Sequence, residues 1–117
     1  MRIFVAFALI FVAVPARAAI PVDGNRLLDF CERTITSVED AGAHIACRNY
    51  VIGVVDGFRL SPGGFKLLVL PDGASGKQLD DIVVKYLKEH PERRHEPGAA
   101  LILSALLDAF PPHVQAK

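Results

Sequence analysis

Few residues in this chain have the types and spacing that enzymatic chemistry needs. The histidines are His44, His90, His95 and His113. His90 and His95 are five residues apart with Pro91 between them, so their rings would not share a helix face as a pair of zinc ligands does. The sequence therefore predicts no metal site.

Acidic and hydroxyl side chains give no better arrangement. Asp80 and Asp81 are adjacent, so their side chains diverge and do not share a proton as a catalytic pair of carboxylates does. Ser104 and Asp108 are four residues apart, but no histidine accompanies them on their segment. The sequence contains neither a glycine-rich phosphate loop nor a GxSxG nucleophile motif. We predict that the protein is not an enzyme and needs no cofactor.

The amino terminus has the features of a secretory signal peptide. Arg2 precedes an unbroken apolar run at residues 3–14, and the small residues Ala16 and Ala18 follow it. This order is typical of a signal that is cleaved after Ala18. The apolar run is shorter than the about 20 residues that a membrane span requires. We therefore expect a signal peptide at residues 1–18, a periplasmic location, and one mature domain at 19–117 without a membrane span.

Charge argues against nucleic acid as a partner. The chain has 13 basic and 13 acidic residues. Removal of Arg2 and Arg17 with the signal peptide would give the mature chain a net charge of about −2. No basic stripe with interleaved aromatic residues is present, so we expect no nucleic-acid binding.

Cys31 and Cys47 are the only cysteines. In an exported protein, an even number of cysteines favours a disulfide over free thiols or a metal site. Closing a loop of this length would stabilise the fold by ~3 kcal/mol in the chain-entropy model. We expect a Cys31–Cys47 bridge between consecutive antiparallel helices, with two buried free thiols as the alternative.

Residues 47–60 contain a clear helical pattern, in which apolar residues recur at the spacing of a core-facing stripe. These residues are Cys47, Tyr50, Val51, Val54, Val55 and Phe58. Gly53 and Gly57 are one turn apart on the flank of the stripe, although an interior glycine costs a helix ~1 kcal/mol. We therefore predict that another backbone packs closely against Gly53.

Capping and turn signals outline the first half of the fold. A short first helix is expected within residues 23–35, with Asp23 or Asn25 as its cap. After a loop at 38–42, the second helix is expected to begin at residues 41–43.

The segment that follows the second helix is predicted to be extended. Ser-Pro-Gly-Gly at 61–64 ends that helix, and the apolar run at 65–70 is too short for a new one before Pro71. Such a strand either covers the helices as coil or pairs with a second copy of the chain. Pro71-Asp72-Gly73 then turns the chain.

A capping box predicts the start of the third helix. The Ser75 hydroxyl would accept a hydrogen bond from the backbone of Gln78, whose side chain would reach back. An ion pair between Asp81 and Lys85 would add a few tenths of a kcal/mol.

Two further stretches complete the chain. The charged stretch 91–97 is either a recognition loop or a solvated connector, and we favour the connector. A fourth helix at 98–110 is apolar almost all round, which places it in the middle of a bundle.

A set of short motifs follows in a fixed order along nearly the whole mature chain. The motifs are Leu27-Leu28-x-x-Cys31, Cys47-x-x-Tyr50-x-x-Gly53-Val54-x-Asp56, Leu70-Pro71, Gln78-Leu79, Val84-x-Tyr86-Leu87-x-x-His90-Pro91-Glu92, Ala105-Leu106 and Ala109-Phe110-Pro111. Together they resemble the Rap/Tai family of immunity proteins. Those are small exported helical proteins associated with type VI secretion that neutralise peptidoglycan amidase toxins in the periplasm.

The resemblance and the helical patterns together predict an all-α fold. It would be a small bundle of about four helices with one disulfide and a short extended segment between helices two and three. The resemblance implies a toxin inhibitor that binds and blocks a peptidoglycan amidase effector, and it allows a homodimer. Family members often carry a second cysteine pair at the positions of Val69 and Pro112 here. Its absence leaves open how firmly the extended segment is tied to the last helix.

The loops that leave the disulfide-linked helices supply the candidate partner-binding residues, because a blocking surface needs protruding and rigidly supported side chains. The candidates are Arg59, Ser61, Asp72 and Ser75, and arginine is enriched at binding hot spots. A different class of function, a small helical periplasmic stress chaperone of the acid-responsive type, is the alternative. Such a chaperone would expose apolar surface when acidified.

Overall fold

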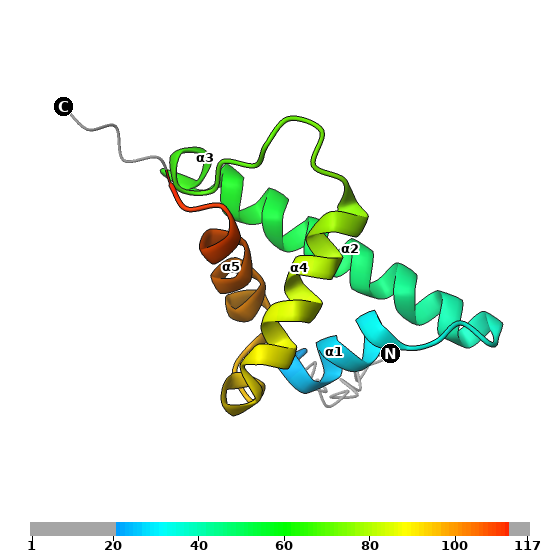
Figure 1. Cartoon of the computed structure of the whole chain (residues 1–117). Helices are drawn as coiled ribbons and strands as arrows, with labels where there is room; N and C mark the ends of the chain where they lie inside the picture. Colours follow the sequence, from blue (N-terminus) through cyan, green and yellow to red (C-terminus); the bar gives the residue numbers. More distant parts are fainter. Residues whose placement is uncertain (1–20, 113–117) are drawn as a thin grey trace, which may run out of the picture.

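The computed structural model describes residues 21–112 as a bundle of helices (Figure 1). The elements are α1 (Gly24–Glu32), α2 (Val38–Leu60), α3 (Gly64–Leu67), α4 (Gly76–Glu89), the 3₁₀ helix η1 (Pro91–Arg93) and α5 (Gly98–Ala109). Within this range there is no β-strand, so the all-α prediction is confirmed. Four helices carry the bundle, and α3 is a single turn. The predicted signal peptide at 1–18 lies outside the described residues.

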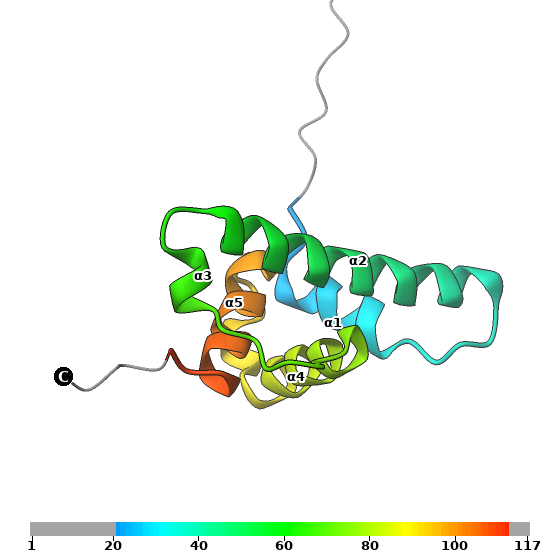
Figure 2. The same ribbon diagram turned by 90° about the horizontal axis from the view of Figure 1, so that it is seen from above.

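The longest helix, α2, is packed along one side of the bundle and extends beyond it at its N-terminal end (Figure 2). Its inner face buries Cys47, Val51 and Val55, and Tyr50, Val54 and Phe58 pack half-buried against the same core. This is the predicted stripe. None of the helices within residues 21–112 has both the length and the apolar character that crossing a membrane requires.

Helix α2 begins earlier than predicted, so the expected loop at 38–42 is wrong. Ser37 caps the helix by accepting a hydrogen bond from the Asp40 backbone N–H at 3.2 Å. The Asp40 carboxylate in turn accepts hydrogen bonds from Thr36 and Ser37, and those from Thr36 are the main reason that its pKa is lowered. The N-cap therefore offsets the weak helix propensity of Val38 and Gly42.

The core lies between the four main helices. Helix α5 buries one side in it and exposes Ala100, Asp108 and Ala109, so it is not enclosed on all sides as its apolar sequence predicts. Fully buried side chains come from all four main helices and from the segment after α3. They include Leu27, Val51, Leu68, Val83, Leu87, Leu101, Ile102 and Leu106. Each buried aliphatic side chain of this size contributes roughly 1.5–3 kcal/mol through the hydrophobic effect.

The stretch between α4 and α5 is an organised joint and not the solvated connector that we favoured. The backbone N–H groups of Gly24 and Asn25 donate to the carbonyls of Glu96 and Arg94 at 3.2 and 3.1 Å. The Gly98 N–H donates to the Val22 carbonyl at 2.7 Å. These bonds fasten the start of α1 to the turn that precedes α5.

Side chains complete this α4–α5 joint. Arg93 forms a two-bond pair with Glu96 at 2.8 Å and also contacts the Tyr86 hydroxyl. Arg94 donates to the Leu87 carbonyl, which satisfies part of the C-terminus of α4. The charged side chains Arg93, Arg94 and Glu96 are thus engaged in bonds within the protein.

The glycine prediction for α2 is wrong. A Cβ atom added at Gly53 or Gly57 would have no atom within 4 Å. The close backbone approaches lie elsewhere: a Cβ at Gly24 would lie 2.9 Å from the Arg94 backbone, and one at Gly98 would lie 2.9 Å from the Val22 carbonyl. The spacing of the glycines in the sequence shows that they share one side of α2, but it does not show whether another backbone packs against that side.

Two smaller predictions for the later helices are also corrected. Asp81 pairs with Lys77 at 2.8 Å, while Lys85 lies 3.8 Å from Glu89, so no Asp81–Lys85 pair forms. Ser75 does cap α4 by accepting from the Gln78 N–H at 3.2 Å. The reciprocal bond from the Gln78 side chain is not formed.

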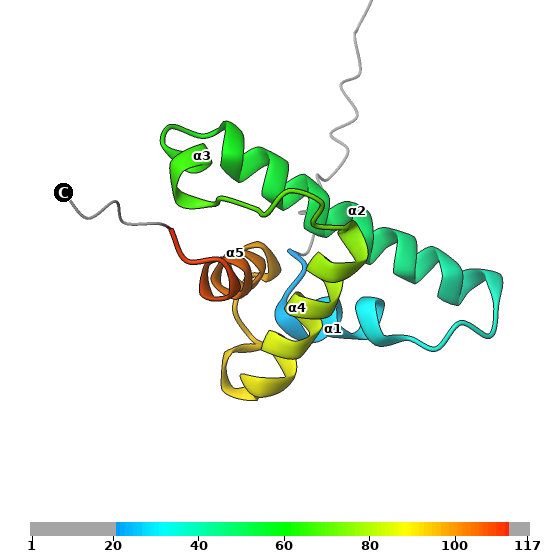
Figure 3. The same ribbon diagram turned by 45° about the horizontal axis from the view of Figure 1, so that its top comes forward.

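The segment 65–70 is extended only in its second half. Residues 64–67 form the single turn of α3, which begins after Gly63 at φ 82°. Gly64 fits there because a Cβ would overlap the Phe58 carbonyl. The chain beyond Leu67 runs past α2 to α4 without pairing as a strand within the described residues (Figure 3).

Candidate partner-binding surface

Two of the three histidines among residues 21–112 have structural contacts, and the third, His95, is exposed. His44 hydrogen-bonds the Arg33 carbonyl, and His90 lies 3.1 Å from Glu92 and stacks on the Tyr86 ring at 4.3 Å. Between residues 21 and 112, no three His, Cys, Asp or Glu side chains are grouped so that they could hold a metal ion. His113 lies outside this range.

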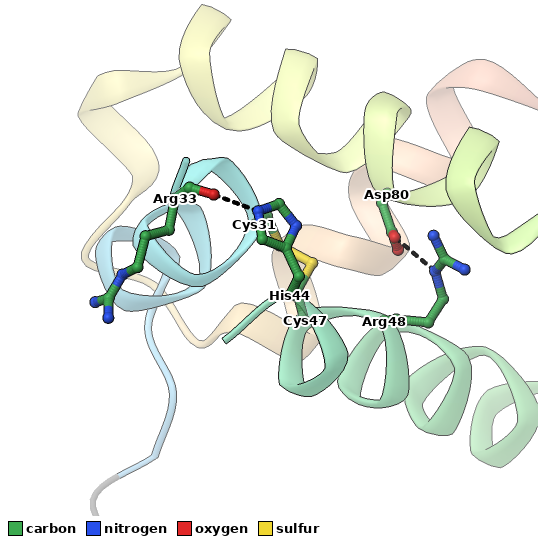
Figure 4. The surroundings of a disulfide bond; sticks show 6 residues. All are labelled: Cys31, Arg33, His44, Cys47, Arg48 and Asp80. Carbon is green, nitrogen blue, oxygen red and sulfur yellow. Dashed lines mark hydrogen bonds and ion pairs between the residues drawn. A yellow bond between two sulfur atoms is a disulfide. The ribbon is translucent and has the colours of Figure 1, made fainter. Parts of the chain in front are cut away.

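One covalent and one ionic link join three helices of the bundle (Figure 4). Cys31 and Cys47 form the predicted disulfide, with their Cα atoms 5.2 Å apart, and this joins α1 to α2. The next residue of α2, Arg48, donates from Nε to Asp80 of α4 at 2.6 Å. The disulfide and this ion pair lie side by side, so three helices are held together at one level of the bundle.

Asp80 shows that this ionic link is partly buried. Burial raises the pKa of Asp80, and the hydrogen bond from Arg48 opposes that rise. Its second carboxylate oxygen is buried without a hydrogen-bond partner. The pair therefore positions α4 against α2 at some cost in desolvation.

Arg59 is held in place by an aromatic ring. Its guanidinium lies over Phe65 at 4.6 Å from the ring centroid, which is the geometry of a cation–π contact. Its Nε is buried without a hydrogen-bond partner. No acidic side chain of residues 21–112 pairs with it. Arg59 thus presents a positioned positive charge beside α3.

The other three candidates have different roles. Ser61 donates to the Phe58 carbonyl at 2.5 Å and closes the end of α2, and Ser75 caps α4. Asp72 is exposed at the tip of a turn closed by the Ala74 N–H and the Pro71 carbonyl at 3.1 Å. No hydrogen bond or ion pair joins any two of the four candidates within the described residues. Ser61 and Ser75 therefore shape the loops, and Arg59 and Asp72 are the side chains with charge to offer.

Sequence reasoning missed an apolar surface around α3. Of the apolar run, only Leu68, which follows α3, is fully buried. Leu70 packs half-buried against the core, and the other apolar side chains are exposed. The exposed fractions are 79% for Leu60, 57% for Phe65, 49% for Leu67 and 43% for Val69. We call these four residues, with Arg59 and Lys66 beside them, the α3 surface. The apolar run at 65–70 could have indicated this surface in the sequence, because it contains more apolar residues than the single one, Leu68, that is fully buried.

A hollow of about 270 Å³ adjoins the α3 surface, lined by Val69, Pro71, Ala109, Phe110 and Pro111. The hollow thus lies between the segment after α3 and the end of α5, and its lining includes Val69, one of the two positions where the resemblance would place a second disulfide.

A family model described as Rap1a immunity proteins matches residues 23–112. The chain belongs to this family. The match runs from the N-cap of α1 to the end of the described structure and includes both cysteines. No curated protein matches the chain, and neither does any solved structure. The family indicates an immunity protein that acts against a secreted effector, and immunity proteins of this kind are generally not enzymes.

Proposed function

We propose that this is a periplasmic immunity protein that binds a peptidoglycan amidase effector of type VI secretion and blocks its active-site cleft. The family match over residues 23–112 carries the proposal. The signal-peptide pattern at 1–18 supports export to the compartment where peptidoglycan lies. The disulfide supports it as well, because such bonds persist in oxidising compartments.

The α3 surface is our candidate for the blocking surface. Arginine is enriched at binding hot spots and phenylalanine in interfaces generally, and the contact between Arg59 and Phe65 holds both side chains in position before binding. Leu60, Leu67 and Val69, close to them in the sequence, add exposed apolar area, and the exposed Lys66 and Asp72 add charge. A tight inhibitor buries about 800 Å² on its own side, so the surface must extend along the loop toward Ala74.

The direct test is titration calorimetry between the mature protein and the amidases that the source cell secretes, combined with an assay of peptidoglycan hydrolysis. We expect saturable binding, loss of hydrolysis, and no turnover by this protein itself. Failure to bind any of those amidases contradicts the proposal. If the protein instead protects client proteins from aggregation at low pH, the chaperone alternative is favoured.

A matched pair of arginines tests the surface. Arg26 lies over Phe30 at 5.4 Å on α1, away from the α3 surface. We expect Arg59→Ala to weaken effector binding by about tenfold or more, as a hot-spot arginine does, and Arg26→Ala to leave it unchanged. Equal effects of the two variants would contradict the choice of surface but not the function.

Export has its own test. The signal-peptide pattern predicts that the mature protein begins at Ala19. Intact-mass measurement of the periplasmic protein should give the mass of residues 19–117. A mass that retains residues 1–18 would contradict the cleavage site.

A further inference from the structure

The α3 surface carries positive charge that no acidic side chain within residues 21–112 neutralises. Neither Arg59 nor Lys66 forms an ion pair there, and the nearest acids in the sequence, Asp56 and Asp72, do not contact them. Most other basic side chains of this region do pair with an acid; these are Arg33, Arg48, Lys77, Lys85, Lys88 and Arg93. The α3 surface therefore combines unpaired positive charge with exposed apolar area.

Arg59 is the more constrained of the two cations. None of the N–H donors of its guanidinium has an acceptor among residues 21–112. The Phe65 ring attracts the cation but offers its donors no oxygen. Because the side chain is half-buried, it has lost part of its hydration without gaining hydrogen bonds, which costs free energy. A partner that supplies the missing acceptor would recover this cost.

The α3 surface continues into the hollow between the segment after α3 and α5, because Val69 belongs to both. The hollow measures about 270 Å³ and has no charged residue in its lining. Sites that bind small molecules measure about 300–1,000 Å³, so this hollow is smaller than such sites. Anchor side chains of protein interfaces fill pockets of this kind. The hollow thus suits one apolar side chain of a partner.

We propose that the α3 surface recognises an acidic side chain of the effector, whose carboxylate accepts hydrogen bonds from the Nη groups of Arg59, together with a nearby apolar side chain that enters the hollow at Val69. A carboxylate matches the planar fork of a guanidinium through two parallel N–H···O bonds. The partial burial of Arg59 strengthens this attraction relative to one between exposed charges. The inference rests on the proposed function and specifies the chemistry of the partner at the same surface.

A protein segment matches this surface better than a lipid membrane or a free anion does. Segments that bind anionic lipid through charge carry about four to eight basic residues, whereas the α3 surface has only Arg59 and Lys66. A free inorganic anion would leave the apolar side chains exposed. An acidic residue beside an apolar one on the effector satisfies the charge and the apolar area together.

Arg59→Met separates a binding role of Arg59 from a structural one. Methionine keeps an apolar contact with Phe65, because its sulfur packs favourably against aromatic rings, and it removes the charge and the donors. We expect the unfolding midpoint to stay equal or rise, since the unpaired buried Nε is removed. Affinity for the amidase that binds the wild type should fall at least tenfold. Arg26→Met, at the contact with Phe30 on α1, is the matched control and should bind like the wild type.

Charge reversal identifies the acidic side chain. Arg59→Glu should weaken binding more than Arg59→Met, because two carboxylates would then meet. Each acidic residue of that amidase is changed to arginine in turn, and one such variant should bind Arg59→Glu at least tenfold more tightly than the unchanged amidase does. Lys66→Ala should slow association with little change in the dissociation rate, as exposed charges at the edge of an interface do.

The outcomes distinguish failure of this inference from failure of the proposed function. A wild type that binds no secreted amidase overturns both. An amidase that binds Arg59→Met as tightly as the wild type, or the lack of any acid-to-arginine variant that recovers Arg59→Glu, overturns the inference alone. A lowered unfolding midpoint of Arg59→Met would also overturn it, because Arg59 would then be structural. Vesicles of phosphatidylglycerol that bind the wild type but not Arg59→Met, with amidase binding unchanged, would assign the surface to a membrane.

Discussion

The two connections that leave and enter α4 are built in opposite ways. The stretch 90–97 before α5 is rich in charge, yet most of its groups bond within the protein. Its backbone bonds to α1, Arg93 pairs with Glu96, and Arg94 donates to α4. The stretch 61–75 before α4 is apolar at its centre, yet Leu68 is its one fully buried side chain. Charge thus marks the rigid joint and apolar residues mark the exposed surface.

The difference follows from how each connection is held. Arginines can bond to carbonyls at a helix C-terminus, so a charged turn can satisfy groups that would otherwise be unpaired. A one-turn helix can bury only one of its sides, so the remaining apolar residues of α3 face outward. An exposed, supported apolar surface suits binding, whereas the joint at 90–97 has few groups left to offer.

The largest effect should come from linking the exposed connection to α5. Val69→Cys with Pro112→Cys introduces a second cysteine pair beside the hollow lined by Val69 and Pro111. We expect a second disulfide that closes a loop of about 40 residues and stabilises the fold by up to about 4 kcal/mol. Urea unfolding and thiol labelling measure this. Two free thiols in the folded, oxidised protein would show that 69 and 112 do not approach.

Leu68 should be the one residue of the exposed connection on which stability depends. Leu68→Ala removes a fully buried side chain, so we expect a loss of about 3 kcal/mol in the free energy of unfolding. Its neighbour Leu67 is 49% exposed, and Leu67→Ala is the matched control with an expected change of about 0.5 kcal/mol or less. Equal losses in the two variants would contradict the outward orientation of the α3 surface.

Replacing a glycine at the joint between α1 and the 90–97 stretch should lower stability, whereas replacing an exposed glycine of α2 should not. An added Cβ at Gly24 would lie 2.9 Å from backbone atoms of Arg94 and 2.5 Å from Leu101. Gly24→Ala should therefore destabilise by about 2 kcal/mol through overpacking. Gly53→Ala has open space and should stabilise by up to about 1 kcal/mol through helix propensity. Chemical unfolding measures the free energy of unfolding of both variants. A stabilised Gly24→Ala or a destabilised Gly53→Ala would contradict this packing.

The smallest expected effect is on how stability changes as the pH falls. Hydrogen bonds from Arg93 hold the pKa of Glu96 below its usual 4.5. A lowered pKa in the folded state means that this contribution is complete above pH 4.5 and is lost as the pH falls. Glu96→Gln should therefore lose less stability than the wild type between pH 6 and about 3. Parallel curves of unfolding midpoint against pH would show that the pair does not stabilise the joint.

Structural features that depend only on residues close together in the chain can be predicted from the sequence. Ser75 caps α4 by bonding to a backbone three residues away, so the cap needs no knowledge of the rest of the fold. The start of α2 carries a similar signal at Ser37 and Asp40, but the β-branched Val38 and the flexible Gly42 favour a loop when the sequence is considered alone. Of the candidate site, Arg59 and Asp72 remain available for a partner, while Ser61 and Ser75 are used as caps.

The sequence by itself determined the all-α class, the cysteine bridge and the inner stripe of α2, because periodicity and spacing record which residues share a face. Only the tertiary structure decided what each face meets. It placed Gly53 in open space and Gly24 against Arg94, and it turned Phe65 outward beside Arg59. The physical reason is that close packing joins residues far apart in the chain, and a helical period is the same whether its face meets a neighbour, a second copy or water.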